Sequence, residues 1–330
     1  MAYGVKALRK IQLGQETTAG TAVAATTVWR GNGVIKDARE IVIVEEDIGL
    51  FVGDGRSFVA KLGAALELED TPATFEQLPY ILSMGLMKDV DGSADGSGSG
   101  KIYTYNLSTN AQATPLTMTI EQGDNTRVDE MEYSFVTEWR LSGSHGEALQ
   151  MGASVVGRQA TDAEFTASVA IPTVEEILFG KGKLYIDATT MGTTLKSGTF
   201  LGFELTGDSG FRAVHTGDGN LYFYAHKQQK PKITGVLILE HDATGEAELN
   251  AARAETKRLV RMVFEGSALT TAGTAYTYKS LVIDAPIKYT EVPQVEDEDG
   301  DDVVRLPFEV LFDGTNNFQI VVVNQLSSLT

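Results

Sequence analysis

The chain has 330 residues, of which 42% are hydrophobic and 22% are charged, a composition typical of a folded globular protein. It has no cysteine, which excludes disulfide frameworks, thiolate metal sites and a cysteine nucleophile. With 27 lysines and arginines against 45 aspartates and glutamates, the formal net charge is −18, and such a chain repels the phosphate backbone of DNA.

The first 34 residues are predicted to form an N-terminal arm. Residues 14–27 are mostly small, show no strong amphipathic period and have no obvious core of their own, which is typical of a loose tail. Apolar residues flank this stretch on both sides, and we expect them to order the arm against a neighbouring subunit. These interface candidates are Ile11, Leu13, Val28 and Trp29.

Most of the remaining apolar residues occur in short alternating runs, which predicts strands. Examples are the runs 41–44, 131–141, 281–289 and 318–323, which are rich in β-branched and aromatic residues. Glycine, aspartate and asparagine clusters between the runs supply the backbone conformations that tight turns need. The sequence therefore predicts a mainly β fold. It contains no run of about 18 apolar residues, so we predict no membrane span.

Two segments have helical spacing instead. In residues 71–84 apolar side chains recur every three or four positions, and Thr74 with Gln77 is a possible capping box. Residues 246–264 form a second, clearer pattern with one apolar stripe. Each helix is therefore expected to flank a sheet. The cations of the second helix are further interface candidates: Arg253, Lys257 and Arg261.

Short matches about half a chain apart suggest a tandem duplication, although β-rich chains also produce such matches by chance. The matched pairs are 63–70 with 235–242, 103–105 with 276–278, and 149–156 with 304–311. The expected organisation is two tandem β-sandwich or half-barrel units, each with one flanking α-helix. The predicted boundaries are 1–34 for the arm, 35–170 for the first β domain and 171–330 for the second.

Motifs for chemistry are missing from the sequence. The four histidines have no metal-ligand spacing, and no nucleophile elbow occurs at a strand-to-helix turn. The glycine-rich segment 91–100 lacks the Gly-Lys-Ser/Thr ending of a phosphate loop. We therefore predict no catalytic residue, no cofactor site and no metal site.

The densest charge lies at residues 296–302, which fail the calcium-loop pattern. One interpretation is a solvated hairpin tip. The other is an acidic projection that faces a basic neighbour or an ion, or lines a cavity. The acidic interface candidates are Glu296, Asp297, Glu298, Asp299, Asp301 and Asp302.

Three segments together resemble a known family. Residues 11–26 are similar to the opening of the tail tube proteins (major tail proteins) of long-tailed, siphovirus-like bacteriophages. The stretches 74–82 and 318–324 resemble segments that this family often carries. Many members are about half this length, so the chain resembles those members that have two fused tube domains.

The resemblance implies a structural protein rather than an enzyme. Three chains would form a ring with pseudo-sixfold symmetry, and rings would stack into a hollow, acidic-lined tube. Double-stranded DNA would pass through without specific binding. The implied partners are other copies of the chain and the tape-measure, tail-tip and tail-terminator proteins. The protein would be made in the host cytoplasm and reside in the virion, with no membrane contact.

Two other interpretations stay open. A β-rich carbohydrate-active enzyme or carbohydrate-binding virion protein would use clustered carboxylates with aromatics such as Trp139, Tyr222 and Tyr224. A needle or secretion-tube protein would share the ring arrangement but not the phage setting.

Overall fold

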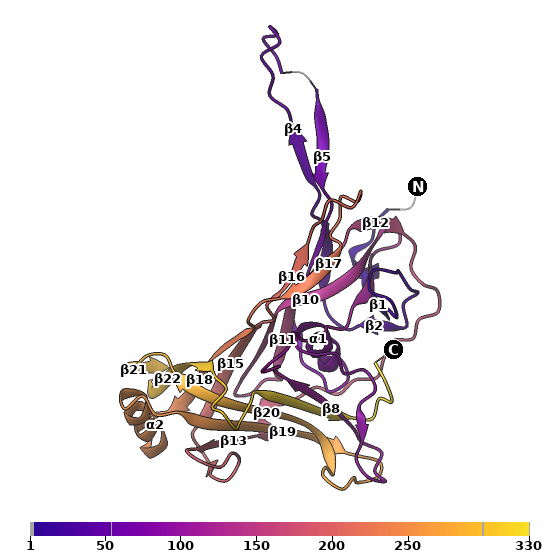
Figure 1. Cartoon of the computed structure of the whole chain (residues 1–330). Coiled ribbons are helices and arrows are strands. Elements are labelled where there is room, and N and C mark those ends of the chain that lie inside the picture. Colours follow the sequence, from indigo (N-terminus) through magenta and orange to yellow (C-terminus); the bar gives the residue numbers. More distant parts are fainter. Residues whose placement is uncertain (1–2, 54, 299, 330) are drawn as a thin grey trace.

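The computed structural model describes residues 3–53, 55–298 and 300–329, and 48% of the chain lies in strands, which confirms the mainly β fold. Two α-helices occur among these residues, α1 (Leu78–Gly85) and α2 (Ala243–Arg253). Figure 1 shows a body of large antiparallel sheets from which one long hairpin projects.

The strands of the first half are β1 (Lys10–Gln15), β2 (Thr27–Trp29), β3 (Gly33–Asp37), β4 (Glu40–Ile43), β5 (Ser57–Lys61), β6 (Ala64–Pro72), β7 (Ser93–Ala94), β8 (Lys101–Asn106), β9 (Met118–Gly123), β10 (Val128–Ser144), β11 (Gln150–Gly157) and β12 (Ala160–Ala163). Those of the second half are β13 (Gly182–Asp187), β14 (Leu195–Lys196), β15 (Phe200–Asp208), β16 (Phe211–Val214), β17 (Ala225–Gln228), β18 (Lys232–Glu240), β19 (Arg258–Ala268), β20 (Tyr278–Tyr289), β21 (Val295–Glu298), β22 (Asp301–Val310) and β23 (Gln319–Asn324).

The strand pairings of the first half recur in the second half in the same chain order. In the first half, the order of hydrogen-bonded strands is β2, β1, β9, β10, β11, β6 and β3. In the second half, the order is β14, β13, β19, β20, β22, β18 and β15. The hairpin β4–β5 follows β3, and the hairpin β16–β17 follows β15. Likewise α1 follows β6 and α2 follows β18.

Two of the three sequence matches fall on strands that hold corresponding places in this pattern. Residues 63–70 and 235–242 overlap β6 and β18, and residues 149–156 and 304–311 overlap β11 and β22. The third match is not an equivalence. Residues 103–105 lie on β8, which is inserted between α1 and β9, whereas residues 276–278 lead into β20 and only Tyr278 belongs to it.

Main-chain hydrogen bonds join the two halves. The end of β10 pairs with β15 from Glu138↔Asp208 to Ser144↔Gly202, and β23 lies between β20 and β8. The largest cluster of buried apolar residues also draws on both halves. The predicted divide near residue 170 therefore separates the two sets of recurring strands, but it does not separate two sheets or two cores.

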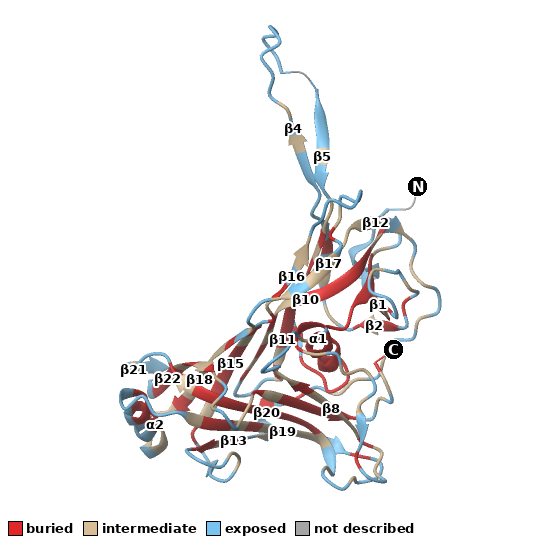
Figure 2. Cartoon of the chain, in the orientation of Figure 1, coloured by how far each residue is buried: buried red, intermediate tan, exposed pale blue. Residues whose placement is uncertain are grey.

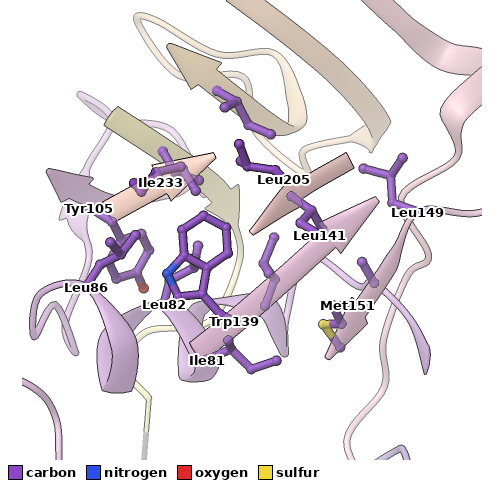
Figure 3. Packing of buried hydrophobic residues seen from close by; sticks show 14 of the residues in the cluster. Ile81, Leu82, Leu86, Tyr105, Trp139, Leu141, Leu149, Met151, Leu205 and Ile233 are labelled. Carbon is purple, nitrogen blue, oxygen red and sulfur yellow. The ribbon is translucent and has the colours of Figure 1, made fainter. Parts of the chain in front are cut away.

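Trp139 of β10 lies at the centre of this core (Figure 3) and is only 1% exposed. Its partner across the β10–β15 pairing is Gly207, where any Cβ would collide with the indole ring. The indole also stacks on Phe318, with ring centroids 6.3 Å apart. The missing side chain at Gly207 thus makes room for the ring on which both halves pack.

Helix α1 differs from the expected flanking helix because all eight of its residues are buried. It is enclosed within the body beside β10 and β8 (Figures 1 and 2). Pro79 is tolerated because it lies in the first turn, where backbone N–H groups have no intrahelical partner. The Gln77 N–H donates to Thr74 Oγ1 at 3.2 Å, which is one half of the expected capping box.

Helix α2 begins where Asp242 Oδ1 accepts the Thr244 and Gly245 N–H groups, and it ends at Arg253. The prediction of a helix through residue 264 was wrong. Residues 258–268 form β19, in which Val260, Met262 and Phe264 alternate into the core. Glu255 has a φ of 51°, which is incompatible with a continuing α-helix. Beyond it, alternate residues are buried, as in a strand rather than a helix.

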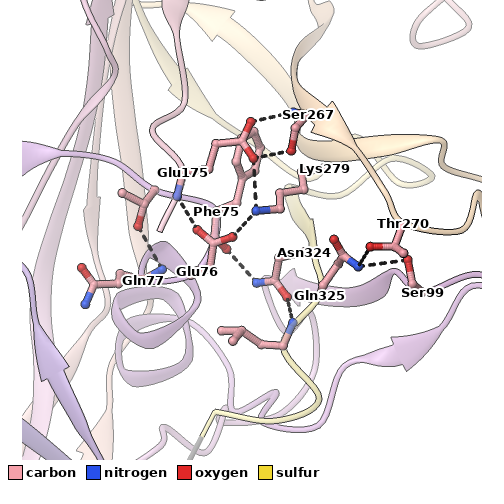
Figure 4. Close-up of polar contacts among 12 residues, drawn as sticks. Phe75, Glu76, Gln77, Ser99, Glu175, Ser267, Thr270, Lys279, Asn324 and Gln325 are labelled. Carbon is pink, nitrogen blue, oxygen red and sulfur yellow. Dashed lines mark hydrogen bonds and ion pairs between the residues drawn. The ribbon is translucent and has the colours of Figure 1, made fainter. Parts of the chain in front are cut away.

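A polar network ties the segment just before α1, the connection between β12 and β13, and the second half together (Figure 4). Lys279 Nζ of β20 lies 2.6 Å from Glu76 Oε1 and 3.1 Å from Glu175 Oε2. Glu175 also accepts the N–H and the hydroxyl of Ser267 on β19. Burial opposes the charge on Lys279, but hydrogen bonds and attraction from the two carboxylates outweigh it and raise the Lys279 pKa.

Replacing Lys279 with methionine is expected to destabilise the chain by about 3–5 kcal/mol, because it leaves the buried Glu76 carboxylate beside Glu175 without a cation. Urea unfolding followed by tryptophan fluorescence measures this change. The matched control is Lys183→Met, which removes the exposed pair with Glu265 and should cost about 0–1 kcal/mol. Equal losses in the two variants would contradict the assigned role of the network.

Candidate assembly surfaces

The hairpin β4–β5 is the most prominent surface feature. Figure 2 shows it projecting from the body with exposed residues along nearly its whole length. Its base touches the β16–β17 region, where the Leu62 N–H donates to the Leu221 carbonyl at 2.9 Å. Beyond the base it packs on no other part of the described chain in this view.

The hairpin exposes large apolar side chains: Ile41, Ile43, Ile48, Leu50, Phe51, Val52 and Phe58. Phe51 is completely exposed, at 108% of its reference area. Glu45, Glu46 and Asp47 lie between these residues, and Glu46 forms an ion pair with Arg56 on the other arm. Exposed apolar side chains concentrated on one projecting segment are typical of interaction surfaces, because leaving them in water forgoes the free energy of burial.

The N-terminal interface candidates lie elsewhere than expected. Ile11, Leu13 and Trp29 are buried in the chain's own core, and Val28 is half-buried. They belong to β1 and β2, and β1 is hydrogen-bonded between β2 and β9. The prediction of a separate arm over residues 1–34 is therefore wrong for the described residues: their alternating side chains are covered by the first half of the same chain.

The three cations of the predicted helix do not share one face. Arg253 is in the last turn of α2, Lys257 is in the connection to β19, and Arg261 is on β19. Arg261 makes a bidentate ion pair with Asp284 at 2.6 and 2.7 Å, and these hydrogen bonds raise its pKa. Arg261 is thus satisfied within the chain and is a poor candidate for an intersubunit contact, whereas Lys257 is exposed.

The acidic segment forms the hairpin β21–β22, and its described carboxylates are exposed in the single chain. This exposure fits both a solvated tip and a projection that faces a neighbour. Arg305 of β22 lies 3.1 Å from Glu296 and 2.7 Å from Glu298. Asp297, Asp301 and Asp302 complete the described acidic candidates, and Asp299 lies outside the described residues. Arg305 thus neutralises part of the charge from within the chain.

Buried carboxylates were not identified from the sequence. Glu16 accepts the N–H groups of Tyr133 at 2.7 Å and Gly20 at 2.8 Å, and it thereby supports the bulge in β10 where Tyr133 has a φ of 54°. Glu121 accepts the Thr166 N–H at 2.7 Å and anchors the linker between the halves. Both groups hold loops on the sheet, and only their tertiary surroundings distinguish them from surface acids.

The aromatic residues named for a carbohydrate site do not all reach the surface. In the described part of the chain, no group of three or more histidine, aspartate or glutamate side chains is placed to hold a metal ion. Trp139 is buried in the core and cannot stack on a carbohydrate, while Tyr224 is exposed and Tyr222 is half-buried. Over the same residues, no helix is both long enough and apolar enough to cross a membrane.

Comparisons with known proteins add no identification. No family model matches the sequence, and no curated protein matches it either.

Proposed function

We propose that this chain is a structural subunit of a phage tail tube, which polymerises as stacked rings into a hollow conduit for double-stranded DNA. The observation that carries the proposal is the projecting hairpin β4–β5, whose apolar side chains are uncovered in the single chain. Such a surface needs a partner, and a subunit that repeats along a polymer meets that need with further copies of itself.

The recurring strand pattern supports a ring of three chains. Because the two halves repeat the same pairings, three chains would present six similar units around an axis. Within the chain, the halves meet through main-chain pairing of β10 with β15. We propose that related edge contacts join neighbouring chains, which would also cover strand edges that otherwise promote aggregation.

The charge of the chain supports a conduit rather than a DNA-binding protein. Basic walls would hold phosphates through counterion release, whereas a net charge of −18 opposes such binding. DNA would then move through the proposed tube without being held.

Negative-stain electron microscopy of the purified chain tests the proposal. We expect rings or hollow filaments, and native mass measurement should give rings built from three copies of the 35.5 kDa chain. Monodisperse single chains over a wide concentration range, together with glycan binding or hydrolysis, would instead favour the carbohydrate interpretation. A gel-shift assay with double-stranded DNA should show no specific complex.

A further inference from the structure

A hollow of about 520 Å³ lies where the ends of four segments meet: the end of β8, the start of β18, the connection from α2 to β19, and the end of β22. Apolar side chains line part of it, including Leu107, Ile233, Val310 and Phe312. Phe312 is 54% exposed. The size is within the range of sites that enclose several large side chains or a small ligand. We call this hollow the lysine groove.

Three lysines also line the lysine groove: Lys230, Lys232 and Lys257. Lys232 lies 3.4 Å from Glu309, and the charge of Lys257 lowers the Asp313 pKa, after the larger effect of hydrogen bonds from Asn316. Neither Lys230 nor Lys257 has an ion-pair partner within 4.0 Å in the described ranges. The groove is therefore a cationic, partly apolar site on a strongly acidic chain.

The tip of β4–β5 has the complementary composition. Its acidic residues Glu45, Glu46 and Asp47 are followed at once by the exposed apolar residues Ile48 and Leu50 to Val52. Arg56 pairs with Glu46, which leaves Glu45 and Asp47 as the acids available to a partner. Figure 1 places this tip far from β18 and β22, so the hairpin does not fill the groove of its own chain.

We infer that the lysine groove of one copy receives the tip of β4–β5 from a second copy. Phe51 and Leu50 pack on the apolar wall around Phe312, while Lys230 and Lys257 face Glu45 and Asp47. Burial of the aromatic ring supplies most of the affinity, and the opposite charges fix the orientation of the hairpin. This inference rests on the proposed self-assembly and adds to it the surface that receives the hairpin.

Cysteine crosslinking tests the contact directly, because the chain has no native cysteine. Gly53→Cys labels the tip at a position with open space around it, and Ser108→Cys labels the rim of the groove. The two variants are mixed under assembly conditions and treated with a short bismaleimide. We expect a covalent dimer that contains one copy of each variant. Gly53→Cys mixed with Ser197→Cys, an exposed residue on another loop, is the control.

A charge swap provides the second measurement. Lys230→Glu with Lys257→Glu is expected to raise the concentration needed for assembly about tenfold, and adding Glu45→Lys with Asp47→Lys should restore it. The control is Lys181→Glu with Lys227→Glu, which changes the net charge equally at exposed positions outside the groove.

The outcomes separate this inference from the proposed function. If the unaltered chain does not assemble at all, the proposed function fails. If it assembles, but the groove variants assemble normally and Gly53→Cys does not crosslink preferentially to Ser108→Cys, the hairpin has another receptor and the groove inference is overturned.

Discussion

Replacing Leu50 and Phe51 with aspartate is expected to raise the concentration required for assembly by about 100-fold or more, while the subunit stays folded. Both side chains are exposed in the single chain, so their loss costs the fold little. In the polymer each would be buried, and losing two large apolar contacts removes roughly 3 kcal/mol or more per interface. Light scattering against protein concentration measures assembly, and circular dichroism measures the fold.

The control for the hairpin is Ile171→Asp, which introduces one aspartate in place of an apolar residue that is 70% exposed between β12 and β13. It should assemble like the unaltered chain. Normal polymerisation of the Leu50→Asp, Phe51→Asp variant would show that the hairpin is not needed for assembly, and the proposed function would lose its main support. Aggregation of that variant with loss of β signal would show instead that the hairpin stabilises the body.

Removing residues 1–28 is expected to prevent folding, rather than merely assembly. The deletion takes away β1, which pairs with β9, and with it the buried side chains of Ile11 and Leu13. Each of these side chains is worth about 2–5 kcal/mol when truncated to alanine, and a domain has only about 5–15 kcal/mol of stability in total. Circular dichroism and solubility after expression would report the loss.

A milder comparison keeps this prediction measurable when the deletion does not fold. Leu13→Ala should lower the free energy of unfolding by about 2–5 kcal/mol, whereas Leu8→Ala should change it by less than about 0.5 kcal/mol. Leu13 is 2% exposed and Leu8 is 55% exposed, although both lie in the same N-terminal stretch. A soluble, folded protein lacking residues 1–28 would restore the idea of a detachable arm.

The errors in the predicted elements have a common physical origin. The run 41–44 was correctly predicted as strand, but it belongs to the projecting hairpin, where Ile41 and Ile43 meet no core. The cations 253–261 suit a helix stripe by spacing, yet Glu255 ends the helix and Arg261 faces Asp284 from a strand. Periodicity reports which face of a segment is apolar, but it does not report what covers that face.

The candidate surfaces also differ in how far the local sequence could predict them. The hairpin at the acidic segment and its exposure in the single chain were expected from the sequence, because close-packed like charges repel one another and favour water. Its contact with a neighbour stays a prediction. The lysine groove was missed, because Lys230 and Lys257 are far apart from Phe312 in the sequence and converge only when β18, β22 and α2 pack together. No short stretch of the sequence could therefore predict that these residues line one hollow.

The amino-acid sequence by itself determined the mainly β character, the strong negative charge and the acidic turn, and it indicated a repeated order of elements. These properties depend on composition and on local backbone preferences. The tertiary structure decided that β1 is core, that α1 is enclosed, and that the apolar hairpin is left uncovered. Such outcomes depend on contacts between segments distant along the chain, where one strand can satisfy its hydrogen bonds and apolar face with several different neighbours.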